Sequence, residues 1–198
     1  MSLSNPKLVF VFSGKRKSGK DFLTNELIKM LPENSTVILR LSGPLKKEYA
    51  DENKLDFSRL LDASEYKENF RAAMVRWGEQ KRNEDPGFFC RLAINEYKGE
   101  KHPIWIVSDA RRTTDLDFFQ RAFPKATKLC RVTATDEVRE KRGWKFVEGI
   151  DDEETECGLD HFKGWDFEMD NSGLIGPHDL LRGCLKLALD TIRKSKEE

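Results

Sequence analysis

Short apolar runs and amphipathic segments alternate along this chain. Five runs have the length and apolar content of strands that are covered on both faces of a sheet, at residues 7–12, 36–41, 104–108, 128–134 and 167–170. Segments with helical periodicity or helix-boundary signals lie between and after them, at residues 21–31, 65–83, 87–97, 115–123, 136–143 and 178–194. The alternation predicts an α/β fold, a three-layer sandwich around a five-stranded parallel sheet.

Two stretches interrupt this alternation. About 60 residues, 42–101, separate the second and third predicted strands, which is too many for one crossover helix, and we expect a helical lobe that holds a substrate. Residues 136–163 begin with a basic helix and continue into a segment rich in glycine and acid, where we expect a mobile lid. Its acidic run is typical of solvated surface. We therefore expect a single domain with a core of about 1–41, 102–135 and 164–198.

Composition and charge narrow the class of protein. The 35 basic and 35 acidic side chains cancel, which argues against a nucleic-acid-coating protein. The apolar runs are far shorter than the roughly 20 residues that cross a bilayer, and the N-terminus lacks the features of a secretory signal. The four cysteines form no C-x-x-C pair and fit reduced thiols. We expect a cytosolic protein without a peroxisomal C-terminal signal, a monomer by default, that binds neither membranes nor nucleic acid.

The motif Gly14-x4-Gly19-Lys20 has the spacing of a P-loop and lies between the first predicted strand and helix. Its glycines let backbone N–H groups surround phosphate oxygens, and its lysine reaches the outer phosphates. The next residue, where the motif usually has a Ser or Thr that binds Mg²⁺, is Asp21. This carboxylate could approach Mg²⁺ through water or could cap the helix, and Ser18 is a second candidate hydroxyl. The motif predicts a site for a nucleotide phosphate.

A second polar cluster, Asp109-Ala-Arg111-Arg112, follows the third predicted strand, at the edge of the sheet where α/β proteins bind ligands. Asp109 could order Mg²⁺ or its waters, and the two arginines could bind a phosphate bidentately. The alternative is a helix-capping aspartate followed by two solvated arginines.

Cations of the predicted lobe and the fourth strand also have two interpretations. Lys67 and Arg71 face the same way on a helix, where they repel unless an anion or an acid lies between them, but a solvated helix surface fits equally well. Arg131 lies in an otherwise apolar strand and needs a partner there, either a ligand phosphate or a structural carboxylate.

The basic residues at the start of the predicted lid, and Asn171 beyond it, also have two interpretations each. Arg139, Lys141 and Arg142 could stabilise charge on a transferring phosphoryl group, or could complement the C-terminal dipole of their helix. Asn171, after the last strand, could contact a nucleotide base or could belong to a plain turn.

In order and spacing, these motifs resemble those of animal-type phosphomevalonate kinases over nearly the whole chain. The resemblance is carried by residues 12–22, 39–46, 76–79, 85–90, 107–112 and 156–160. An aspartate after the P-loop lysine is part of that family's pattern. The resemblance implies a nucleoside-monophosphate-kinase-like fold that transfers the γ-phosphoryl group of ATP to (R)-5-phosphomevalonate. The products would be 5-diphosphomevalonate and ADP, on the mevalonate route to isoprenoids and sterols.

The resemblance also implies roles for individual residues. ATP would be bound by Gly14, Lys15, Arg16, Lys17, Ser18, Gly19, Lys20, Asp21, Arg131, Arg142 and Asn171. The acceptor would be bound by Lys67, Arg71, Arg82, Arg91, Arg111, Arg112 and Asn171. Transfer itself would depend most on Lys20, Arg16, Lys17, Arg111 and Arg142. Mg²⁺ would accompany ATP, with Asp21 and Asp109 as candidate ligands, either directly or through water.

Three other functions are compatible with parts of this pattern. A nucleoside monophosphate kinase or another small-metabolite kinase would use the same fold, and a nucleotide-binding regulator would bind ATP without turnover. A GTPase-type switch is suggested by Asn53-Lys-Leu-Asp56, which matches the guanine-reading string N-K-x-D. That string lies in a polar segment before the third predicted strand, whereas the guanine-reading loop follows a late strand, so its position argues against a GTPase.

Overall fold

The central sheet contains the five strands that the sequence predicts. The structure, a computed structural model, describes residues 6–61 and 65–197, apart from the side chains of Glu65, Lys67 and Lys196. Its five strands pair in parallel in the order β2-β3-β1-β4-β5. Their bounds are Leu8–Ser13 (β1), Thr36–Leu39 (β2), Ile104–Ala110 (β3), Thr127–Thr133 (β4) and Phe167–Asp170 (β5). The prediction of an α/β fold around a five-stranded parallel sheet is confirmed.

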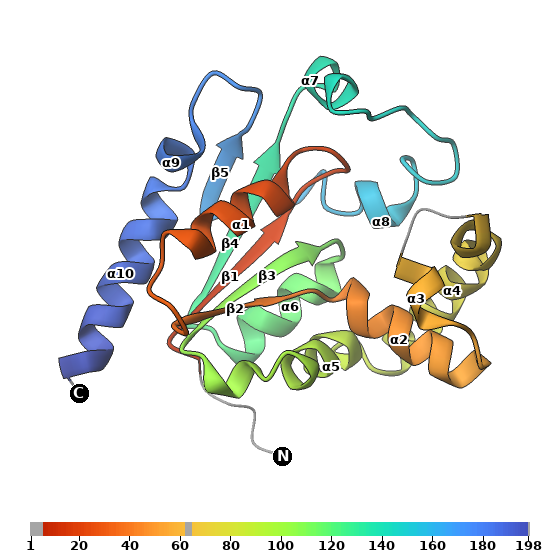
Figure 1. The fold of residues 1–198 in the computed structure, drawn as a ribbon, viewed down its shortest axis with the longest axis horizontal. Helices are drawn as coiled ribbons and strands as arrows, with labels where there is room; N and C mark the ends of the chain where they lie inside the picture. The colour runs from red at the N-terminus through yellow and green to blue at the C-terminus, as the bar shows by residue number, and fades with distance from the viewer. Residues whose placement is uncertain (1–5, 62–64, 198) are drawn as a thin grey trace.

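Helices cover both faces of the sheet (Figure 1). Side chains of α1 (Lys20–Lys29) and α10 (Arg182–Glu197) pack with Phe10 and Phe12 on one face. Side chains of α5 (Phe88–Glu96) and α6 (Thr113–Ala122) pack on the other. Because successive side chains of a strand point to opposite faces, the apolar run of β1 contributes to both cores.

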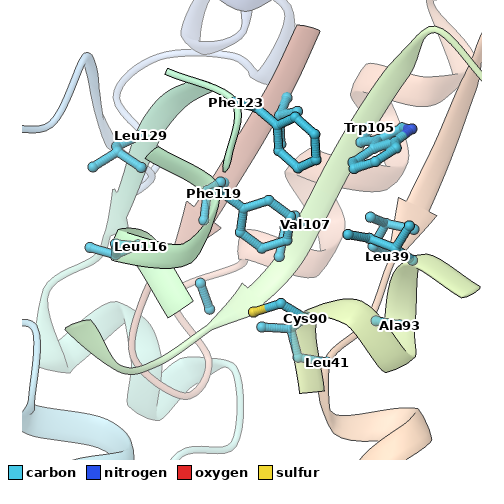
Figure 2. Close-up of a cluster of buried hydrophobic side chains, with 14 of the residues drawn as sticks. Leu39, Leu41, Cys90, Ala93, Trp105, Val107, Leu116, Phe119, Phe123 and Leu129 are labelled. Carbon is cyan, nitrogen blue, oxygen red and sulfur yellow. The ribbon is translucent and has the colours of Figure 1, made fainter. Parts of the chain in front are cut away.

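The core beneath α6 combines aliphatic side chains with the buried aromatic rings of Trp105, Phe119 and Phe123 (Figure 2). Trp105 and Phe123 meet edge to face with their ring centroids 5.2 Å apart. The indole N–H of Trp105 donates to the carbonyl oxygen of Gly99 at 2.8 Å, so this fully buried polar group has a partner. Phe119 of α6 belongs to the same cluster, beside Val107 of β3, and is completely buried.

In the lobe segment, residues 42–101, the two helices predicted at 65–83 and 87–97 are present as α4 (Glu65–Glu84) and α5. The apolar pattern did not predict α2 (Ser42–Asn53), α3 (Phe57–Leu61) or the 3₁₀ turn at Gly99–Lys101. Tyr49, Leu60 and Met74 form a small core of their own, apart from the two cores against the sheet. Pro44 does not break α2, because it lies in the first helical turn, where no N–H partner is lost.

The lid segment, residues 136–163, contains α7 (Asp136–Lys141) and α8 (Glu154–Cys157), with irregular chain between them. The C-terminal helix, predicted as residues 178–194, is divided into α9 (Pro177–Leu180) and α10. Leu181 separates the two, because its backbone angles, φ −90° and ψ −2°, depart from the values of about −63° and −42° of a regular α-helix. Within the described ranges, 6–61 and 65–197, we find no helix of the length and apolarity that crossing a bilayer requires.

We expect Phe119→Ala to lower the free energy of unfolding by about 3–5 kcal/mol, because it removes a fully buried ring and leaves a cavity. Urea denaturation measures this change. The matched control is Phe146→Ala, whose ring is 61% exposed and whose loss should change stability by less than about 1 kcal/mol. Equal losses in the two variants would contradict the assignment of Phe119 to the core.

Candidate active site

The predicted P-loop lies where the sequence places it, as residues 14–19 between β1 and α1. Gly19 has φ +91°, and a Cβ atom there would lie 2.2 Å from Nδ2 of Asn171. A Cβ atom at Gly14 would lie 2.6 Å from the carbonyl oxygen of Val132. Both glycines are therefore required for the loop to fold closely against the ends of β4 and β5.

A cleft of about 410 Å³ opens at this loop, and we call it the phosphate-loop cleft. Apart from Gly19 and Asp21, all of its lining residues are basic: Lys15, Arg16, Lys17, Lys20, Arg111 and Arg142. Lys20 is buried at the start of α1, and its Nζ lies 3.0 Å from Oδ1 of Asp21. So many cations around one opening favour a polyanionic ligand.

Arg142 and Asn171 join the lid segment and the end of β5 to the phosphate loop. Nη1 of Arg142 donates to the carbonyl oxygen of Ser18 at 3.0 Å, and its Nη2 donates to that of Asn171 at 2.6 Å. Nδ2 of the buried Asn171 donates to the same Ser18 oxygen at 2.9 Å. Three segments far apart in sequence therefore meet at one backbone carbonyl, and both side chains lie beside the loop.

A second cavity, of about 160 Å³, lies between the sheet edge and the lobe segment, and we call it the lobe cavity. Its lining combines the basic residues Lys46, Arg82, Arg111 and Arg112 with apolar side chains such as Met74. Arg111 lines both this cavity and the phosphate-loop cleft. One guanidinium group therefore stands at the junction of two cation-rich openings.

Two acids, the half-buried Glu79 and the buried Asp115, hold the arginines of the lobe cavity. Nε of Arg112 donates to Oε1 of Glu79 at 3.0 Å, and Arg82 lies 4.0 Å from Asp115. The carboxylate of Asp115 accepts the backbone N–H groups of Arg111 and Arg112 at 3.0 and 3.1 Å. Burial raises the pKa of Asp115, while the nearby Arg82 acts in the opposite direction. Asp115 thus caps α6 and also fixes the backbone that carries the arginine pair.

Other predicted acceptor residues lie elsewhere. Arg71 pairs with Glu68 at 2.7 Å on α4 and does not line the lobe cavity. Arg91 pairs with Asp85 and lies against the ring of Phe118 at a separate cavity. The side chain of Lys67 is outside the described part of the chain.

For Arg131, the structure contains the carboxylate partner that was one of the two alternatives. Its Nη2 donates to Oδ1 of Asp160 at 2.9 Å, and its Nη1 donates to the hydroxyl oxygen of Ser13 at 3.1 Å. The guanidinium also lies over the ring of Trp165, 5.6 Å from its centroid. The charge in this apolar strand is therefore compensated within the protein.

The two candidate Mg²⁺ ligands have different surroundings. The side chain of Asp21 is 65% exposed at the phosphate-loop cleft. Both carboxylate oxygens of Asp109 accept backbone N–H groups, from Leu41 at 2.7 Å and Ser42 at 3.0 Å, so Asp109 joins the end of β3 to the start of α2. In the described ranges, no three His, Cys, Asp or Glu side chains gather in a way that could hold a metal ion.

The sequence analysis missed the acids of the lid segment as part of the site, and expected the acidic run to be solvated. Asp151 and Glu156 are instead buried, which corrects that expectation for these two residues. Asp151 pairs with the guanidinium of Arg16 at 3.0 Å, and Glu156 accepts from Arg111. Asp160 pairs with Lys15 at 2.6 Å. Their clearest sequence signal was the segment 156–160, which contributed to the family resemblance.

Comparisons of the sequence with known proteins point to one family. A sequence model of the family described as phosphomevalonate kinase matches residues 12–125. A curated phosphomevalonate kinase of Drosophila melanogaster is 38% identical over 166 residues, which are 82% of this chain and 87% of that protein.

Two crystal structures share the fold. TT1252 from Thermus thermophilus has a TM-score of 0.53 at 17% identity, over 94% of this chain and 98% of its own. A gluconokinase from Sinorhizobium meliloti has a TM-score of 0.50 at 11% identity, over 96% of this chain and 99% of its own. At these identities the likeness concerns the fold alone. The family match and the relative's identity establish more: the chain belongs to the phosphomevalonate kinase family.

Proposed function

We propose that this chain transfers the γ-phosphoryl group of ATP to (R)-5-phosphomevalonate, with 5-diphosphomevalonate and ADP as products. The observation that carries the proposal is the position of Arg111, which lines both the phosphate-loop cleft and the lobe cavity. A phosphoryl transfer between two phosphates needs a cation at their meeting point, since both groups are negatively charged. Family membership supports this choice of donor and acceptor.

Charge arithmetic explains the number of cations. ATP carries about −4 and the acceptor about −3, whereas one Mg²⁺ ion returns only +2. Lys15, Arg16, Lys17, Lys20 and Arg142 would compensate the donor phosphates at the phosphate-loop cleft. Arg82 and Arg112 would do so for the acceptor in the lobe cavity, together with Lys46, which the predicted site did not include.

The reaction would then proceed by positioning and charge stabilisation. An oxygen of the acceptor phosphate attacks the γ-phosphorus, the bond from that phosphorus to the β–γ bridging oxygen breaks, and ADP leaves. The second pKa of a phosphate monoester is about 6, so the attacking oxygen is already largely ionised and needs no general base. In this scheme Lys20, Arg16, Lys17, Arg142 and Arg111 bind the reacting phosphates, and Asn171 holds the loop beneath them.

Asp21 fits the role of a Mg²⁺ neighbour better than Asp109, because its carboxylate is exposed at the cleft while Asp109 is engaged by two amides. When bound, the ion would neutralise donor phosphate charge, and most of its ligands would be phosphate oxygens and water. The prediction of a cytosolic protein is supported by the four cysteines, which are all free thiols. The monomeric state stays a prediction from the sequence.

The proposal predicts turnover confined to one acceptor. ADP release with Mg-ATP should be seen with 5-phosphomevalonate and not with mevalonate, since the cations of the lobe cavity select an acceptor that already carries a phosphate. It should also be absent with AMP, CMP, UMP or GMP, since family membership favours 5-phosphomevalonate over a nucleotide. Turnover with a nucleotide would keep the fold and overturn the acceptor. ATP binding without ADP release from any acceptor would favour a regulator.

Lys20→Met should abolish turnover and leave the fold intact, because it removes the cation at the start of α1 while keeping an unbranched side chain. Steady-state kinetics and circular dichroism measure the two effects. Near-normal activity in this variant would rule out the role proposed for Lys20.

Arg112→Met should raise KM for the acceptor roughly 10- to 100-fold and leave KM for ATP within about twofold, since Arg112 lines only the lobe cavity of the two. The matched control is Arg121→Met, in the helix α6 that Arg112 precedes, with its side chain 85% exposed, which should behave as the unmodified enzyme. A rise in KM for ATP alone would contradict the assignment of the two cavities.

A further inference from the structure

Glu156 is a buried carboxylate of the lid segment that contacts two parts of the site at once. It lies on α8, where its residue is 8% exposed. Its Oε2 accepts the backbone N–H of Arg16 at 2.9 Å, and its Oε1 accepts from Nη1 of Arg111. Each oxygen therefore serves a different element: the phosphate loop on one side and the turn after β3 on the other.

This placement has an energetic consequence. A carboxylate removed from water is costly unless its charge is compensated, and here the guanidinium of Arg111 provides the compensation. Arg111 is constrained in return, because its Nη1 also donates to the carbonyl oxygen of Thr155 at 3.0 Å. Two adjacent residues of the lid segment thus hold one end of a long side chain that would otherwise sample several rotamers.

The phosphate loop is held by the same segment. The backbone of Arg16 donates its N–H to Glu156 and accepts from Nε of Arg139 at 2.9 Å. Both backbone polar groups of a loop residue are thereby engaged by residues outside the loop. Glu156 thus contacts both the loop and the guanidinium at the junction of the two cavities, and it lines neither the phosphate-loop cleft nor the lobe cavity.

We propose that Glu156 is a positioning residue for phosphoryl transfer, which acts through Arg111 and the amide of Arg16 and does not itself touch the substrates. It fixes the guanidinium of Arg111 at the junction where donor and acceptor phosphates would meet. Because it also accepts the amide of Arg16, it holds this guanidinium at a constant position relative to the phosphate loop. An arginine held in place before the substrates arrive stabilises the developing charge without first losing its own rotamer freedom. The inference rests on the proposed function, since it requires both phosphates at this junction.

The test is a double-mutant cycle with Glu156→Gln and Arg111→Met, assayed with Mg-ATP and 5-phosphomevalonate. Glutamine keeps the shape of the side chain but removes the charge that holds the guanidinium. We expect kcat of Glu156→Gln to fall roughly 10- to 100-fold while KM for each substrate and the affinity for ATP, measured by calorimetry, stay within about twofold. In the Arg111→Met background the same substitution should reduce kcat by no more than about twofold, because the group through which it acts is absent.

A matched control and a second variant keep the outcome decisive. Glu154→Gln makes the same chemical change at an exposed position of α8 and should retain full activity. If Glu156→Gln does not fold, Glu156→Asp replaces it in the cycle. Aspartate keeps the negative charge, but its side chain is shorter by one methylene, so the carboxylate lies farther from Arg111.

Three results would overturn the inference: unchanged kcat with only a lower melting temperature, which indicates a purely structural contact; an equal loss of kcat with and without Arg111; or a loss confined to KM. Failure of the proposed function is recognised separately, because the unmodified enzyme would then show no turnover with 5-phosphomevalonate.

Discussion

The site depends on one constraint: cations can be concentrated and partly removed from water only if carboxylates lie among them. The chain is electrically neutral as a whole, with 35 basic and 35 acidic side chains. It nevertheless brings six basic residues to a single cleft. Self-repulsion among these groups would oppose folding, and the structure relieves it with acids drawn from distant segments.

These acids come from two directions. Glu79 of α4 pairs with Arg112, and Asp115 of α6 lies beside Arg82, so the lobe segment is tied to the sheet at the lobe cavity. On the opposite side, the lid segment supplies Asp151, Glu156 and Asp160 to cations of the phosphate loop and its surroundings. The charge network therefore joins the two insertions to the core in addition to their apolar packing on the sheet.

Much of the fold could be predicted from the sequence because its signals are local. All five strands lie within a few residues of their apolar runs, since a strand covered on both faces needs an almost uninterrupted apolar sequence. The helices α2 and α3 were harder to recognise, because this part of the chain is polar and the first turn of α2 contains Pro44. The break at Leu181 was missed because apolar periodicity continues through it.

The phosphate loop could be predicted from one short segment, because the spacing of Gly14, Gly19 and Lys20 and their place after a strand are local properties of the chain. Which distant charges meet could be seen only in the folded chain. It brought Arg111 to both cavities, left Arg91 and Arg71 outside the lobe cavity, and buried Glu156 between Arg111 and the loop. The physical reason is that a charged side chain looks the same in sequence whether it is solvated or paired, and its partner is chosen by the packing of segments far apart along the chain.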